Sequence, residues 1–178
     1  MSSREQIKTY LDAGHSKELR DEIVAYVGES KSKMKQLMTF FFHKEWRYNQ
    51  RSSWAVAHLA SIHPHLLSPY LPQMVKGLET PKHDAVIRNT LRIFEDIVIP
   101  EDLEGELLDS CMNFLVDLKQ AIAIRCFSIT VIDKIVQRFP ELAPEVIEII
   151  NDQLDYPQSA GFKVRARRAL KSLQTLAS

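Results

Sequence analysis

The residues of this chain best suited to binding chemistry are tryptophans and arginines that share one short segment. Trp46, Arg47, Arg51 and Trp54 lie close together in the sequence, and positions 47, 51 and 54 fall on one face of a helix. Guanidinium and indole groups dominate the energetic centres of protein interfaces, and both stack on nucleobases or other rings. The segment therefore predicts a surface for an anionic or aromatic ligand. The alternative interpretation is that Trp54 packs in the core.

The same arginine recurs along the chain at a nearly constant interval. Arg51, Arg88 and Arg125 are 37 residues apart, and Arg165 follows after 40; we call these four the register arginines. Each lies in a segment that is about half apolar, with its apolar residues at helical spacing, such as VIRNTLRIF and AIRCFSITVI. A period in this range is typical of stacked helix pairs. The repeat thus predicts an all-α chain, an α-α superhelix of about four to five helical hairpins.

Further basic residues extend the candidate binding surface. Arg92 lies one helical turn after Arg88. The last segment, 159–178, carries five basic residues and no acidic one, namely Lys163, Arg165, Arg167, Arg168 and Lys171. Such a run can bind a carboxylate or a phosphate, or it can keep a terminal helix of the array soluble. Lys163 and the arginines of these segments therefore belong to the candidate binding surface.

Motifs of enzyme chemistry are missing from the sequence. It has no G-x-S-x-G, no phosphate-binding glycine loop and no H-E-x-x-H. His63 and His65 flank Pro64 without a cysteine or carboxylate cluster, so we expect turn histidines rather than metal ligands. Cys111 and Cys126 have neither metal spacing nor the numbers of a disulfide framework. We expect a protein with no catalytic residue, no cofactor and no metal.

Composition agrees with an ordinary folded domain. The chain has 178 residues, 45% hydrophobic and 26% charged, with a formal net charge of zero. No apolar stretch is long enough for a membrane span, and the first residues carry charge instead of an apolar signal region. We therefore expect a cytoplasmic protein with no membrane partner. No feature of the sequence bears on its oligomeric state.

The segments predict a single domain of successive hairpins. Residues 1–30 are expected to form N-terminal capping helices, followed by repeats over 31–63, 64–97, 98–138 and 139–178. Ser3 and Ser16 are predicted N-caps and Gly14 and Gly28 predicted C-caps. Pro69, Gly105 and Pro144 stand near one register in the first helix of successive repeats, which predicts a bend in each.

Two columns of side chains follow the register arginines. The next residue is small or compact (Ser52, Asn89, Cys126, Ala166), and a branched or apolar residue follows four positions later (Val56, Ile93, Thr130, Leu170). A small column lets neighbouring helices approach, and the second column fills the seam between them.

Charge separates by helix type. Segment 101–117 holds six acids and segment 140–155 holds five, and neither holds a base. The second helices of the repeats carry the basic excess, unless these runs are simply solvated helix faces.

The stretch ETPKHDAVIRNTLRIFEDI resembles a HEAT repeat, and the resemblance covers roughly residues 31–176. Asp84 and Arg88 occupy the places where that family often keeps an Asp and an Arg. Arg47, Ala121 and Gly161 stand where Asp84 does in the other repeats. The chain also resembles small bacterial HEAT or armadillo-like proteins of unassigned activity. The resemblance implies a right-handed solenoid in which second helices line a concave face, which here would be basic.

Three functions stay open at this point. The first is a non-enzymatic scaffold module that binds an acidic protein or peptide segment on the basic concave face. The second is nucleic-acid binding, since HEAT-like DNA glycosylases hold duplex in such a face and Trp46, Trp54, Arg51, Arg88 and Arg125 resemble their contacts. The third is an accessory subunit of an enzyme.

Overall fold

The computed structural model describes residues 1–80 and 83–176, and within them the chain is all α, as predicted. Its contacts divide it into two compact units, Met1–Ile97 (unit 1) and Val98–Ser178 (unit 2). The division coincides with one predicted repeat boundary, between residues 97 and 98. The single-domain organisation stays a prediction.

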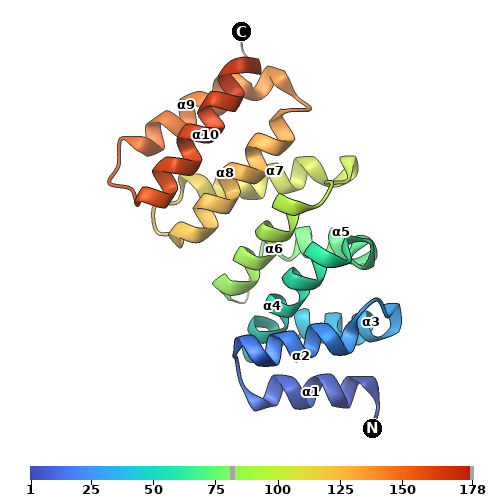
Figure 1. Ribbon diagram of the computed structural model, residues 1–178. Helices are drawn as coiled ribbons and strands as arrows, with labels where there is room; N and C mark the ends of the chain where they lie inside the picture. The colour runs from blue at the N-terminus through green and yellow to red at the C-terminus, as the bar shows by residue number, and fades with distance from the viewer. Residues whose placement is uncertain (81–82, 177–178) are drawn as a thin grey trace. The chain divides into compact units, whose positions relative to one another are not determined.

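Unit 1 consists of helical hairpins in sequence order. Its long helices are α1 (Ser3–Ala13), α2 (Lys17–Val27), α3 (Lys31–Phe41), α4 (Trp46–Ile62) and α6 (Asp84–Asp96). The segment between α4 and α6 holds two 3₁₀ turns, η1 (Pro64–Leu66) and η2 (Ser68–Tyr70), and the short helix α5 (Leu71–Lys76). The second helices α2, α4 and α6 lie side by side, and α1 packs beside α3 (Figure 1).

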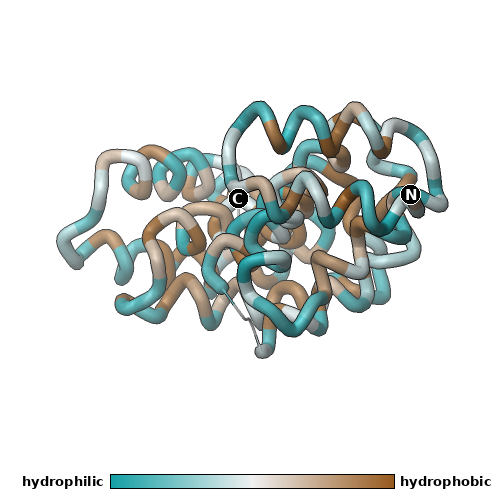
Figure 2. Tube along the Cα trace, turned by 90° about the horizontal axis from the view of Figure 1, so that it is seen from below, coloured by the Kyte–Doolittle hydropathy of each residue, from teal (hydrophilic) through white to brown (hydrophobic). Residues whose placement is uncertain are grey.

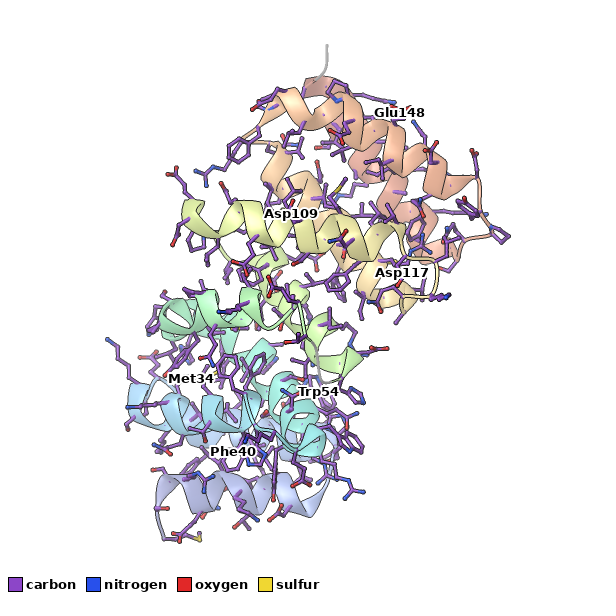
Figure 3. The ribbon with its side chains drawn as sticks, turned by 180° about the vertical axis from the view of Figure 1, so that it is seen from behind. Met34, Phe40, Trp54, Asp109, Asp117 and Glu148 are labelled. Atoms are coloured by element: carbon purple, nitrogen blue, oxygen red, sulfur yellow. The ribbon has the colours of Figure 1, made fainter. Side chains whose placement is uncertain are left out.

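The core of unit 1 lies between these two helix layers. Leu37, Val56, Leu59 and Phe94 have no solvent exposure. Figure 3 labels Met34 and Phe40 on α3, which are also buried. Because no hairpin can bury its apolar side alone, stacking is what removes this surface from water.

Unit 2 repeats the arrangement with two hairpins. It comprises α7 (Glu101–Val116), α8 (Ile122–Val136), the 3₁₀ turn η3 (Pro140–Leu142), α9 (Ala143–Leu154) and α10 (Ala160–Leu176). Helix α8 packs against both α7 and α10. Hydrophilic and hydrophobic residues alternate along the turns of the helices (Figure 2), as expected where one face is packed and the other solvated.

The columns predicted to carry the stacking are largely buried. Ser52 and Ala166 are fully buried and Asn89 is nearly so, whereas Cys126 is half-buried. Farther along the same helices, Val56 and Ile93 are buried too. Buried small residues are what a close helix approach requires, and the close approach itself stays a prediction.

The proline-containing segment after α4 is interrupted, whereas the helix that contains Gly105 is continuous. Residues 64–76 do not form one bent helix but two 3₁₀ turns and a short helix, with prolines in each first turn. Helix α7 runs through Gly105 without interruption. Proline removes a backbone N–H and clashes with the preceding turn, whereas glycine keeps its hydrogen bond, so the helix is continuous at Gly105. The bend at Gly105 stays a prediction.

The helix caps follow the predicted chemistry with one shift. Gly14 and Gly28 terminate α1 and α2, and Ser16 caps α2. The N-cap of α1 is Ser2, not Ser3. The Ser2 hydroxyl accepts from the Glu5 N–H while the Glu5 carboxylate accepts from the Ser2 N–H. This reciprocal pair of hydrogen bonds satisfies two backbone N–H groups, which favours Ser2 as the N-cap.

Candidate functional site

The candidate site begins at the N-terminus of α4, where the sequence placed its aromatic and basic residues. Trp46 is the first residue of the helix and 46% exposed. Arg47 is exposed, whereas Arg51 and Trp54 are half-buried on the same helix face. No side chain caps this helix end, so its backbone N–H groups add a partial positive charge.

The ring of Trp46 joins the starts of two second helices. It stacks on the imidazole of His83, with ring centroids 5.4 Å apart and planes 8° from parallel. The Arg47 guanidinium lies 5.4 Å from the Trp46 ring centroid. His83 is the N-cap of α6, and its Nδ1 accepts a hydrogen bond from the Ala85 N–H at 3.0 Å. Nδ1 is therefore unprotonated, and Nε2 carries the hydrogen of the neutral ring.

Trp54 forms the other end of the site. The Arg20 guanidinium lies 4.8 Å from the Trp54 ring centroid, and the His15 ring lies 5.1 Å from it. Arg20 also donates from Nε to the Asp21 carboxylate at 2.8 Å. Figure 3 shows Trp54 on α4. The indole thus takes part in surface contacts with the α1–α2 turn and α2 rather than being enclosed in the core.

Electrostatics connect the two ends. Partial burial lowers the pKa of His15, and so do the charges of Arg51, Arg88 and His83. Arg51 and Arg88 carry permanent positive charges, so cationic groups converge on His15 and oppose its protonation. We call His15, Trp46, Arg47, Arg51, Trp54, His83 and Arg88 the basic–aromatic site.

The nearby carboxylates of Asp12 and Asp84 form no ion pair with these arginines among the described residues. Asp12 pairs with Lys8 at 2.5 Å and accepts from the Tyr48 hydroxyl at 2.7 Å. These hydrogen bonds, and to a smaller extent the charge of Arg51, lower the pKa of Asp12. Asp84 is exposed one turn before Arg88, and within residues 1–80 and 83–176 the two form no ion pair. The converging cations are therefore poorly neutralised by the chain itself.

The four register arginines have different environments. Arg51 donates to the Leu11 carbonyl, in the last turn of α1. Arg165 donates to the Thr130 hydroxyl at 2.6 Å and lies 4.8 Å from the Phe127 ring centroid. Arg88 is exposed, and among the described residues it makes no hydrogen bond, ion pair or ring contact.

Arg125 does not belong to a binding surface. Its residue is only 4% exposed. Its Nε donates to the Leu115 carbonyl at 3.0 Å, and its other nitrogens donate to Gln158 at 3.2 Å and Gln153 at 2.9 Å. The guanidinium also lies 4.7 Å from the Phe162 ring centroid. We therefore correct the expectation that Arg125 is available to a partner: it holds α7, α9 and α10 together.

The remaining predicted residues lie outside the basic–aromatic site. Arg92 is exposed on α6. In unit 2, Lys163, Arg167 and Arg168 are exposed on α10, whereas Arg165 is half-buried against α8. The exposed basic residues of α10 form a second basic group, which belongs to unit 2.

Sequence reasoning missed His15, Arg20 and His83. His15 and Arg20 lie in the first hairpin, before the 37-residue register begins, so periodicity gave no reason to align them with α4. His83 immediately precedes Asp84 and the first turn of α6. A polar residue at that position is a helix-start signal that could have identified it.

The described residues offer neither a metal-binding cluster nor a membrane-spanning helix. In the part of the chain that the structure describes, no group of three His, Cys, Asp or Glu side chains is placed to hold a metal ion. Across residues 1–80 and 83–176, no helix combines the length and apolarity needed to cross a membrane.

A comparison with protein families matches the HEAT repeat domain over residues 7–173. The chain belongs to the HEAT-repeat family. No curated protein and no solved structure matched it. HEAT repeats generally mediate protein–protein interaction and are typically non-enzymatic. Stacked hairpins suit this role because they present long continuous surfaces.

Proposed function

We propose that this HEAT-repeat protein is a non-enzymatic interaction module that binds an acidic segment of another protein at the basic–aromatic site. The observation that carries the proposal is the convergence of the Arg51 and Arg88 charges on His15, whose pKa is lowered first by partial burial and then by repulsion from these cationic groups. An acidic segment would relieve that repulsion. The exposed indole of Trp46 would supply the aromatic contact that is common at interface centres.

Arg88 is the residue whose substitution tests the proposal most directly. Because it has no intramolecular hydrogen bond or ion pair among the described residues, its replacement should leave the fold unchanged and remove only interactions with a ligand. An exposed ion pair is worth about 0.2–1 kcal/mol, and several charges acting together are worth more. For Arg88→Glu, which also adds a repulsive charge, we expect affinity to fall about tenfold, equal to ~1.4 kcal/mol.

The test uses a fluorescein-labelled oligoglutamate peptide and an oligoglutamine peptide of the same length. Anisotropy should show binding of the first only, weakening with added salt. The chain's two tryptophans, Trp46 and Trp54, should change fluorescence on binding because both lie in the site. Lys35→Glu, an exposed charge reversal on α3, is the matched control and should bind like the unmodified chain. Equal affinities for the two peptides, or equal effects of Arg88→Glu and Lys35→Glu, would refute the proposal.

Nucleic-acid binding is the second candidate, and α10 favours it. This helix carries five basic residues and no acidic one, and Lys163, Arg167, Arg168 and Lys171 are exposed. A row of exposed cations suits the regular charge of a phosphate backbone. Duplex DNA should then bind at low salt, with an affinity that falls linearly on logarithmic axes as salt rises. Arg167→Glu should weaken that binding, and an absence of duplex binding at low salt would eliminate the candidate.

A further inference from the structure

A pocket of about 290 Å³ lies among α3, α4, α5 and α6 of unit 1 and shares no residue with the basic–aromatic site. Its walls include Phe41, Met74, Leu78 and Ile87, none of them more than 3% exposed. Gln73, Lys76 and Thr80 line it from exposed positions. The pocket therefore has a buried apolar interior and a polar rim, which is the usual make-up of a small-molecule site.

Two buried polar side chains also line this pocket. Asn49 is 4% exposed and Thr90 is 1% exposed. The Asn49 amide donates from Nδ2 to the Phe41 carbonyl, the last residue of α3. Its Oδ1 is buried and accepts no hydrogen bond within the described residues. Such an acceptor is uncommon in native proteins and gains from a donor brought by a ligand.

The rim adds a charge. Lys76 is exposed in the last turn of α5, and within residues 1–80 and 83–176 it makes no ion pair. A ligand seated in the pocket with an anionic group at its outer end would meet this ammonium group. Since a cavity of about 150 Å³ accommodates benzene, the present volume has room for a bicyclic ring with a short substituent.

We propose that the pocket binds a small molecule that has an apolar bicyclic ring, one N–H donor directed at Asn49, and a carboxylate directed at Lys76. The occupant is a free small molecule because walls this deeply buried can enclose most of a ligand of that size. The proposal is independent of the acidic-segment site, because the two share no side chain.

The test measures binding of indole-3-propionate to the full chain by calorimetry and by ligand-observed NMR. Its 1-methyl analogue lacks the N–H and should bind about tenfold more weakly. Lys76→Gln should weaken the acid about threefold to tenfold and leave neutral indole unaffected. Lys35→Gln, at an exposed lysine outside the pocket, is the matched control and should change neither affinity.

Two variants separate loss of binding from loss of folding. Val86→Trp places a large ring in the pocket from a half-buried lining position and should abolish binding, with thermal melting confirming that the variant is folded. The comparison of the acid with its 1-methyl analogue needs no substitution at all. Equal binding of those two molecules, or no binding at millimolar concentration, would overturn the proposal. Binding of a tryptophan-containing peptide without binding of the free acid would also overturn it.

Discussion

Replacing Arg125 by methionine should destabilise unit 2 while leaving the basic–aromatic site of unit 1 intact. The substitution removes donors to the Leu115 carbonyl and the Gln153 side chain, both in buried hydrogen bonds. A buried acceptor left without a donor costs about 1–3 kcal/mol. The Gln158 bond is only partly buried, so water can replace much of it. Methionine retains contact with the Phe162 ring.

Burial lowers the pKa of Arg125, which shows that desolvation already opposes its charge. Removing that charge recovers part of the loss. We therefore expect a net decrease of about 2–5 kcal/mol in the free energy of unfolding. With urea slopes of about 1–3 kcal/mol per molar, the midpoint should fall by at least about 0.7 M.

The assay exploits the position of the tryptophans. Trp46 and Trp54 both lie in unit 1, so their fluorescence follows that unit, whereas far-UV circular dichroism follows both. In Arg125→Met the dichroism should develop an earlier transition. Arg88→Met, at an exposed arginine on α6, is the control and should stay within about 0.5 kcal/mol of the unmodified chain. A dichroism midpoint that is no lower in Arg125→Met than in the control would refute the assignment of Arg125 as the organising contact of unit 2.

Three other perturbations have definite expected outcomes. Arg138→Met should cost about 2–3 kcal/mol because it strands the buried Glu104 carboxylate, to which Arg138 donates at 2.7 Å. Adding Glu104→Gln should recover stability in urea titrations, and a double variant as unstable as the single one would contradict this. Burial raises the pKa values of the Cys111 and Cys126 thiols. At pH 8 a disulfide reagent should therefore modify half-buried Cys126 slowly and fully buried Cys111 only in denaturant. Fast modification of both thiols would contradict this expectation. Because the folded pKa of His15 is lowered, the unfolded chain binds its proton more readily, so stability should fall as pH drops below about 6.5. His15→Gln should flatten that decline, and an unchanged slope in pH-dependent melting would refute the assignment.

The repeat architecture could be predicted because one physical requirement recurs in each hairpin. Small residues after the register arginines must admit a neighbouring helix, and apolar residues farther on must fill the seam. Ser52 and Ala166 meet the first requirement, and Val56 and Ile93 meet the second; all four are buried. Periodicity detects these positions because packing constrains them in the same way in every repeat.

The spacing of the register arginines could not predict which of them are buried and which are exposed. Arg125 is buried because Gln153 and Gln158, on the next hairpin, offer acceptors within reach. Arg88 has no such acceptor among the described residues and stays in solvent. The acceptors come from positions about 30 residues away that carry no repeated signal, so alignment of the arginines alone cannot distinguish a structural donor from an exposed one.

This difference also supports placing the proposed binding site in unit 1. In unit 2, Arg125 donates to a carbonyl at the end of α7 and to the Gln153 side chain on α9. In unit 1, Arg51 likewise donates to a carbonyl in the last turn of α1. Arg88 has no such acceptor among the described residues. Arg88 makes no intramolecular hydrogen bond or ion pair among the described residues, and its charge opposes protonation of His15. It therefore does not help unit 1 to fold. Its exposed position is understandable if its stabilising partner is an anion from another molecule.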